Sequence, residues 1–367
     1  MSTSTTAILK RADGAPAAGV QGNVGAVATW LFVCCALIFL MVVIGGITRL
    51  TLSGLSITEW KPVVGVLPPL SPADWAAEFA KYKEIPEYRL VHYAMSLDEF
   101  KTIYFWEYSH RLLGRLVGIA YGVPFAWFLV RRQLPRSLVL PLAGIFLLGC
   151  GQGVLCWYMV ESGLTDRTEV SQYRLVAHLA LALGIYAGIL WMALGIVRGP
   201  SRPAVSAGWR RAAEAVILLI ALTIGAGGLV AGTRAGLIYN TFPLMDGSVV
   251  PADYGRLQPF ILNWFENVAA IQFDHRLLAL ATAVSIVLVW TVGLRAALPR
   301  PCRIALHALL AAAALQVALG IATLLLVVPI PLAVAHQAGA IVLLTTALVL
   351  RHMMRNAHSR RPRYDIG

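Results

Sequence analysis

The chain has 367 residues, of which 58% are hydrophobic and only 13% are charged. An ordinary soluble domain is about 25% charged, so this composition excludes a soluble globular protein and favours a chain that lies largely in a lipid bilayer. The net charge of +12 raises the alternative of a nucleic-acid-binding protein. More than half of the lysines and arginines, however, fall on one side of the predicted membrane. This is the positive-inside bias of membrane proteins, and it explains the basic charge with no nucleic acid as a partner.

Apolar blocks without Asp, Glu, Lys or Arg recur along the whole chain, beginning with the block from Gly14 to Thr48. A bilayer core needs roughly 20 helical residues to cross it, and the backbone polar groups of a spanning segment have to be satisfied inside that segment. The blocks therefore predict an all-α polytopic membrane protein with eight transmembrane helices. The expected spans are 29–48, 104–130, 138–160, 173–197, 212–232, 267–293, 304–328 and 331–350.

The arginine bias predicts that the N-terminal segment 1–28 and the tail 351–367 are both cytoplasmic. Two long loops, 49–103 and 233–266, then lie on the outer side, and loops of this length are often functional. We expect no cleavable signal peptide, because residues 1–26 are polar and small and the first apolar block is long enough to remain an anchor. None of the five cysteines falls in either outer loop, so no disulfide is expected there.

Four landmarks occur in the same order in both halves of the chain. Span 1 ends GGITRLT and span 5 ends GGLVAGTRAG, while span 2 opens EYSHRLLGR and span 6 opens QFDHRLLAL. Gln152 in span 3 matches Gln316 in span 7, and VAHLALAL in span 4 matches VAHQAGAI in span 8. Because each half has an even number of spans, both keep the same orientation, related by an axis along the membrane normal. We expect two pseudo-symmetric four-helix bundles, 29–197 and 212–350, joined by a cytoplasmic linker at 198–211.

One histidine lies near the outer end of each even-numbered span, namely His110, His178, His275 and His336. Ionisable groups inside a membrane are costly and usually functional, and neutral imidazole is a good ligand of haem iron. Facing helices of a bundle hold cofactors in this way, so we expect two bis-histidine haem sites, one in each half. A closed zinc site would need cysteine or a third ligand. Helix packing through hydrogen-bonded histidines is the remaining alternative.

The two halves differ in one residue beside these histidines. Glu107 lies three residues before His110 and faces the same way on its helix, whereas Gln272 occupies the matching position before His275. A carboxylic acid beside an iron site can move protons and a glutamine cannot. Glu107 is therefore the candidate catalytic residue, and the first half is the candidate reaction site. The alternative is that Glu107 only forms a salt bridge with Arg111 at i+4.

Arginines gather at the outer ends of the same spans. Arg49, Arg111, Arg234 and Arg276 are candidates for charge-assisted hydrogen bonds to haem propionates, and Arg115 lies among them. The alternative is that these side chains are interface anchors whose charged heads snorkel to water.

The sequence resembles the haem A synthase family over nearly its whole length. The resemblance rests on the runs EYSHRLLGR, TRLTLSGLSITEWKPVVGVLPP, TRAGLIYNTFPLMDG, FDHR and VAHQAGA. It implies an eight-helix enzyme of a bacterial or mitochondrial inner membrane. Such an enzyme oxidises the C8 methyl group of haem O to a formyl group, giving haem A for terminal cytochrome oxidases. The resemblance also implies a haem b cofactor ligated by His275 and His336. His110 and His178 would then ligate the substrate haem O, with Glu107 as the essential glutamate.

Some members of that family carry a cysteine pair in an outer loop, and this chain does not. It therefore resembles the cysteine-free class of alphaproteobacteria and mitochondria, and a bacterial inner membrane is favoured because residues 1–28 make a poor transit peptide. The implied pathway makes haem O synthase a partner beside the lipid bilayer. The electron-transfer partner is not indicated, and a homo-oligomer is compatible with the sequence. Two other functions stay open: a non-catalytic di-haem electron-transfer cytochrome, and a haem transporter or chaperone.

Overall fold

The computed structural model describes residues 18–60, 64–166, 170–198 and 205–355. Within these ranges eight helices are long and apolar enough to cross a membrane, so the predicted all-α polytopic membrane fold is confirmed. The helices are α1 (Ala18–Leu50), α4 (Leu97–Val130), α5 (Arg136–Asp166), α6 (Gln172–Arg198), α7 (Ala207–Gly232), α9 (Val268–Arg295), α10 (Arg300–Leu325) and α11 (Ile330–Met353).

Each expected span overlaps one of these helices, although the ends differ by several residues. Much of the segments expected in the cytoplasm, at both termini and in the linker, lies outside the described residues.

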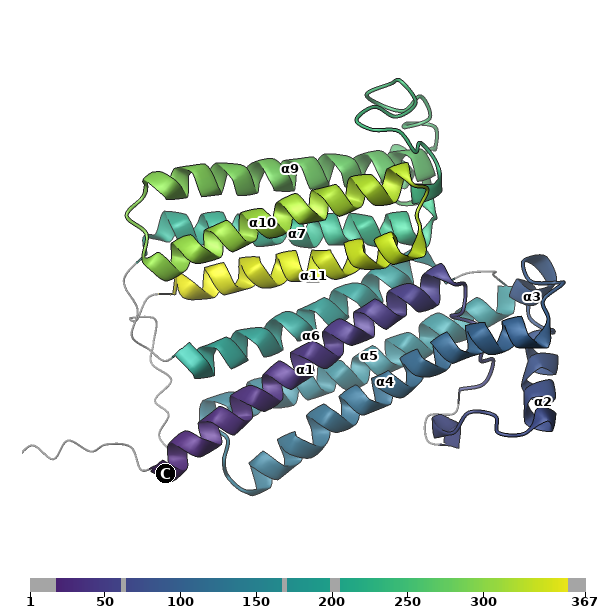
Figure 1. Ribbon diagram of the computed structural model, residues 1–367, viewed down its shortest axis with the longest axis horizontal. Coiled ribbons are helices and arrows are strands. Elements are labelled where there is room, and N and C mark those ends of the chain that lie inside the picture. The colour runs from purple at the N-terminus through teal and green to yellow at the C-terminus, as the bar shows by residue number, and fades with distance from the viewer. Residues whose placement is uncertain (1–17, 61–63, 167–169, 199–204, 356–367) are drawn as a thin grey trace, which may run out of the picture.

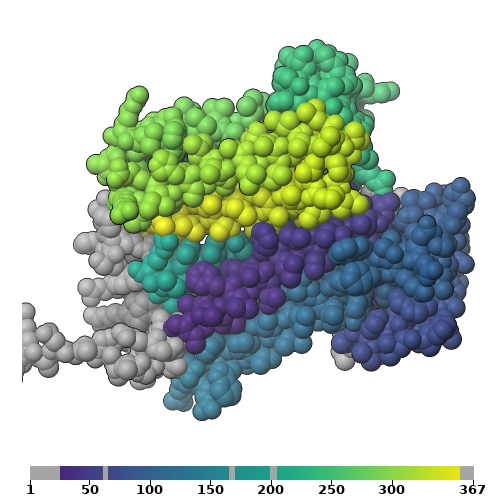
Figure 2. Space-filling model, in the orientation of Figure 1, coloured from purple at the N-terminus to yellow at the C-terminus, as the bar shows by residue number. Residues whose placement is uncertain are grey.

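The spanning helices lie in two groups of four (Figure 1). The first group contains α1, α4, α5 and α6, and the second contains α7, α9, α10 and α11. The groups meet where α6 contacts α7 and where α1 contacts α11. Figure 2 shows α1 and α11 running side by side along this junction.

The two groups share one apolar core. Buried side chains from both groups belong to a single cluster, among them Leu31, Ile189, Ile220 and Ile341. Two hydrogen bonds also cross the junction. Tyr186 on α6 shares one with Thr345 on α11, at 2.7 Å between the hydroxyl oxygens. The amide of Gln337 on α11 donates to the Val42 carbonyl on α1 at 2.7 Å. Because the helices would otherwise be surrounded by equally apolar lipid, such packing and hydrogen bonds are what holds them together.

Both long loops lie at the same end of the helices, which we call the loop end (Figure 1). In the first half, residues 51–96 contain η1 (Val64–Val66), α2 (Pro72–Tyr82) and α3 (Pro86–Leu90). We call this segment the cap. It packs on the first half through a second buried cluster, formed by Leu55, Ile57, Phe79, Tyr82, Ile85, Phe100, Ile103, Tyr104 and Val160.

Helix α4 begins at Leu97, whereas the span expected from the sequence began at residue 104. Its first turn is stabilised by a capping box, in which the Ser96 side chain accepts from the Glu99 amide and the Glu99 side chain accepts from the Ser96 amide. The added turns place Phe100 and Ile103 against the cap, where both are buried. The helix therefore continues past the apolar block to support the cap.

The second long loop contains η2 (Ala235–Leu237), η3 (Phe260–Leu262) and α8 (Asn263–Glu266). Buried amide side chains hold it in place. Asn263 donates to the Leu257 carbonyl at 2.9 Å, and Asn267 donates to the Asp253 carbonyl at 2.6 Å. Asn267 also caps α9 by accepting from the backbone amides of its first turn.

Candidate functional site

The structure places the four predicted histidines as two matched pairs. In the first half, His110 on α4 lies close enough to His178 on α6 to feel a charge on that ring. In the second half, His275 on α9 is placed in the same way relative to His336 on α11. In the part of the chain that the structure describes, no three His, Cys, Asp or Glu side chains cluster in a way that would hold a metal ion. Pairs suit haem iron, because the macrocycle supplies the equatorial ligands and the protein only the axial ones.

Glycines of neighbouring helices make room for the rings. A Cβ atom at Gly45 on α1 would lie 2.9 Å from Cε1 of His110, and one at Gly227 on α7 would lie 3.0 Å from Cε1 of His275. Each of these glycines is the first residue of a repeated run, GGITR in the first half and GGLVAGTR in the second. That repeat is the sequence signal from which their role beside the histidines could have been predicted. In both halves, then, the backbone of the first helix closes one side of an imidazole ring.

In the second half, both histidines have a hydrogen-bond partner at Nδ1. Nδ1 of His275 lies 3.2 Å from the Thr223 carbonyl oxygen, which can only accept, so the ring donates from Nδ1. Nδ1 of His336 lies 3.2 Å from Nε2 of Gln316, which also donates to the His336 carbonyl at 2.9 Å. Partners of this kind fix the orientation of a metal-binding imidazole.

In the first half, one of the two histidines has such a partner among the residues that the structure describes. Nε2 of Gln152 lies 3.1 Å from Nδ1 of His178 and donates to the His178 carbonyl at 3.0 Å. Nδ1 of His110 is buried and has no hydrogen-bond partner among the described residues. Gln152 and Gln316 were landmarks of the repeat with no predicted role, and the structure shows that each one supports a histidine.

Glu107 is buried between α4 and the cap, with 3% of its surface exposed. Its Oε2 accepts hydrogen bonds from the Ser56 hydroxyl and the Ile57 amide, both at 2.7 Å. Its Oε1 accepts from Nε and Nη2 of Arg111, at 2.9 and 2.6 Å. The salt bridge considered above as the alternative is therefore present, and both carboxylate oxygens are engaged.

Arg111 extends this contact further into the cap. Its Nη1 donates to the Glu59 carbonyl at 2.9 Å, and its Nη2 donates to the Ile57 carbonyl at 2.8 Å. The guanidinium also lies over the Trp60 ring, 5.2 Å from the ring centre. Glu107 and Arg111, which we call the first clamp, thus fasten the cap to the helix that carries His110.

The second half repeats this arrangement with Gln272 and Arg276, which we call the second clamp. Arg276 donates to the Gln272 side-chain oxygen at 3.1 Å. The two side chains also donate, at 2.5–2.9 Å, to the backbone carbonyls of Tyr239, Thr241, Ala235 and Ile238. The polarity differs between the clamps, because Glu107 accepts from its loop whereas Gln272 donates to its loop.

The four arginines predicted to contact propionates fall into two matched pairs. Arg111 and Arg276 belong to the clamps. Arg49 lies in the last turn of α1, and Arg234 follows α7 as the N-cap of η2, with a left-handed backbone at φ 55°. All four lie at the loop end. Arg111 and Arg276 are on the helices that carry His110 and His275, and Arg49 and Arg234 are at or just beyond the ends of α1 and α7.

The histidine sites also differ at one position of the third and seventh spans. A Cβ atom at Gly320, four residues after Gln316, would lie 2.8 Å from Cε1 of His336. In the first half the residue four after Gln152 is Cys156, a free thiol within electrostatic range of the first clamp. The first site therefore carries a carboxylate and a thiol where the second carries an amide and a glycine.

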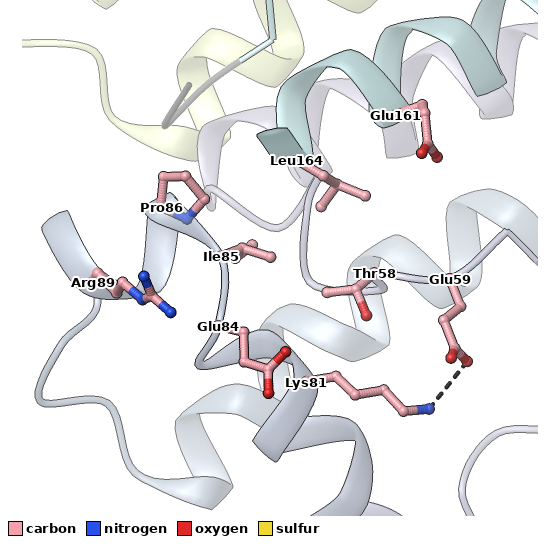
Figure 3. Close-up of a pocket in the computed structure, with 9 residues that line it drawn as sticks. All are labelled: Thr58, Glu59, Lys81, Glu84, Ile85, Pro86, Arg89, Glu161 and Leu164. Carbon is pink, nitrogen blue, oxygen red and sulfur yellow. Dashed lines mark hydrogen bonds and ion pairs between the residues drawn. The ribbon is translucent and has the colours of Figure 1, made fainter. Parts of the chain in front are cut away.

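A polar cleft of about 530 Å³ lies between the cap and the loop end of α5 (Figure 3). Charged side chains line it, including Glu84, Arg89 and Glu161, and the pair between Lys81 and Glu59 closes one side at 3.0 Å between Nζ and Oε2. None of the four histidines lines this cleft. It adjoins the first clamp, since the backbone of Glu59 is bound by Arg111.

Known proteins resemble this chain along almost its full length. The family of cytochrome oxidase assembly proteins designated COX15-CtaA matches residues 28–348, a range that includes both halves and all four histidines. The chain is 51% identical to a haem A synthase of Nitrosospira multiformis, over 90% of this chain and 93% of that protein. It is also 51% identical to a haem A synthase of Rhodospirillum centenum, over 94% of each. The haem A synthase COX15 of Arabidopsis thaliana is 44% identical, over 90% of this chain and 74% of that protein.

Proposed function

The chain belongs to the COX15-CtaA family of cytochrome oxidase assembly proteins, and we propose how its two halves divide the task of a haem A synthase. A haem A synthase is an oxidoreductase that converts haem O to haem A, by two successive oxidations of one methyl carbon to a formyl group. The observation that carries this function is the full-length match to proteins of that name in a chain whose two histidine pairs suit two haems.

We propose that His110 and His178 ligate the substrate haem O and that His275 and His336 ligate a resident haem b. The second pair suits a permanent group, because both of its rings have a partner at Nδ1. When bound, haem b would supply an electron-transfer group beside the substrate site. The first pair suits the substrate, because Glu107 lies one helical turn before His110.

Glu107 is proposed to act as a fixed negative charge near the reacting methyl group. Four donors from Ser56, Ile57 and Arg111 hold its carboxylate, so its position is set before the substrate binds. Preorganised charge of this kind stabilises the positive charge that develops as a carbon loses electrons. Relay of protons by the same carboxylate would first require one of these hydrogen bonds to open.

Arg49 and Arg234 are the proposed propionate ligands. They follow the glycines that lie beside His110 and His275 by four and seven residues respectively, and arginine binds carboxylates by charge-assisted hydrogen bonds. Arg111 and Arg276 would offer a propionate only those guanidinium N–H groups that are not already used in the clamps. Their other N–H groups bind backbone carbonyls of the two loops.

We further propose a bacterial inner membrane as the location, with both termini in the cytoplasm and the loop end outside. The support is the arginine bias of the sequence. The functional halves would then be 29–197 and 212–350, joined on the cytoplasmic side. Haem O synthase is the proposed source of substrate, because the substrate is an apolar haem that has to be handed over within or beside the bilayer.

Pigment extraction tests the function. We expect the protein purified in detergent to carry haem b together with haem O or haem A, measured by separation of the extracted haems and quantified per chain. Haem b alone at two per chain would contradict the synthase and favour the electron-transfer cytochrome. Haem O that is bound and released unchanged, in the presence of a reductant and oxygen, would favour a transporter or chaperone.

The glycine beside the His275 ring gives a second prediction. Gly227→Ala is expected to weaken haem b retention, because the new methyl group would lie 3.0 Å from the His275 ring, and such overpacking typically costs about 1–3 kcal/mol. The measurement is haem b per chain after size-exclusion chromatography. Gly225→Ala is the matched control, since it lies on the same helix and a Cβ there meets nothing within 4 Å. Equal haem b loss in the two variants would argue against this role for Gly227.

A further inference from the structure

The two histidine pairs differ in how their rings are held. An imidazole that binds iron through Nε2 carries its proton on Nδ1, where a neighbouring carbonyl or side-chain amide can serve as its hydrogen-bond partner. Such a partner orients the ring and makes it a stronger ligand, and its loss typically lowers metal affinity roughly 10–100-fold. The partners at Nδ1 thus indicate which axial bonds are strong and which are weak.

By this criterion the second half has two supported ligands and the first half has one. Thr223 and Gln316 support His275 and His336. In the first half Gln152 supports His178, while Nδ1 of His110 is buried without a partner among the residues the structure describes. The first half is therefore built with one strong and one weak axial ligand.

Gln152 is able to hold His178 both with and without haem. Its Nε2 faces Nδ1 of the ring and the carbonyl of the same residue, while its Oε1 is buried and has no hydrogen-bond partner in the described part of the chain. A half-turn of the amide exchanges the two atoms. The side chain donates to Nδ1 when the ring carries its proton on Nε2. When Nε2 binds iron, the turned amide accepts from Nδ1 through Oε1 and gives up its bond to the His178 carbonyl.

We infer that His178, positioned by Gln152, is the fixed axial ligand of the substrate site and that His110 is the exchangeable one. Haem O then binds first to His178, and haem A leaves after the bond to His110 breaks. This rests on the proposed function, which requires the first half to release its haem in every catalytic cycle and the second half to keep its own. Gln152 is a positioning residue here, since it acts through His178.

The inference is tested by binding rather than by turnover. The full chain in detergent is titrated with haem O, and carbon monoxide is then added to the reduced protein. We expect His110→Ala to keep haem O, bound by His178 alone and open to carbon monoxide, whereas His178→Ala fails to retain it. Equal retention in the two variants, or better retention in His178→Ala, overturns the inference.

Substitutions of the glutamines separate positioning from packing. Gln152→Leu, which keeps the side-chain volume, is expected to lower haem O affinity roughly 10–100-fold, and Gln152→Glu is expected to restore it because a carboxylate accepts from Nδ1. Gln316→Leu is the matched change in the second half, and it should lower haem b retention while leaving haem O affinity unchanged. Wild-type haem O affinity in Gln152→Leu would contradict the inference. A wild-type protein that binds haem O but never forms haem A would instead overturn the proposed function.

Discussion

Replacing His275 by alanine is expected to remove haem b from the purified protein, while replacing His178 removes the substrate haem and leaves haem b in place. The two pairs lie in different helix groups, and in the proposed arrangement each haem would be held by its own pair. The measurement is the amount of each extracted haem per chain. A protein that lost the same haem in both variants would contradict the two-site arrangement.

His307→Ala is a suitable control for these variants. His307 is exposed on α10, and its Nδ1 accepts a hydrogen bond from Nε1 of Trp290 at 3.0 Å. It lies near the start of α10, whereas Gly320, which adjoins His336 of α11, lies near the end of that helix. Both haems should remain in this variant, so any loss would indicate a general effect of removing a histidine from the helices rather than the loss of a ligand.

Glu107→Gln is expected to lower haem A formation about a hundredfold or more, the usual effect of removing one preorganised electrostatic group from an active site. The same change breaks the buried pair with Arg111 and places an amide group against the Ser56 hydroxyl and the Ile57 N–H. Loss of one partner of a buried pair typically costs about 3–5 kcal/mol. Haem O binding, thermal stability and haem A formation therefore have to be measured together.

Two further variants show whether the loss of activity in Glu107→Gln comes from the lost charge. Asp98→Asn on the same helix removes an exposed carboxylate that forms an ion pair with Lys101, and it should leave haem A formation unchanged. Ser56→Ala removes one donor to Glu107 but keeps the charge and the Arg111 contact, so we expect a smaller loss of activity than in Glu107→Gln. Full haem A formation by Glu107→Gln, with normal haem binding, would exclude the proposed role of the carboxylate.

The spans and the histidine positions were predictable because they depend on local pattern. A spanning helix needs a long apolar block, and such blocks are visible in any sequence. His110, His178, His275 and His336 stood out because each is a polar residue inside such a block and recurs in the second half. The repeat itself therefore carried most of the functional information.

The cap was not predictable, because its stability comes from residues that are distant in the sequence. The first turns of α4 contain Asp98, Glu99 and Lys101, so they resemble a polar loop, and only the buried faces of Phe100 and Ile103 reveal a helix that supports the cap. The i+4 pair of Glu107 was foreseen. Its other partners, Ser56 and Ile57, lie about fifty residues earlier in the chain and could not be.

The roles of the glutamines and glycines needed geometry for a different reason. Gln152 and Gln316 were recognised as matched, but an amide can donate or accept, and its partner is set by how α5 packs on α6 and α10 on α11. Gly45 and Gly227 act by leaving space for a ring. A glycine has no side chain, so its role in the sequence can be recognised only when the ring that occupies the space beside it is known.

The clamps bear on how the two halves came to differ. Arg111 binds the carbonyls of Ile57 and Glu59, and Arg276 binds those of Tyr239 and Thr241, so each arginine contacts main-chain oxygens two residues apart. Every amino acid presents that oxygen, so replacing the side chains of either loop leaves these bonds intact. After a duplication of an ancestral four-helix unit, one copy could therefore acquire a folded cap and the other a different loop while each remained fastened at the loop end of its helices. Divergence of the loops then required no loss of the shared architecture.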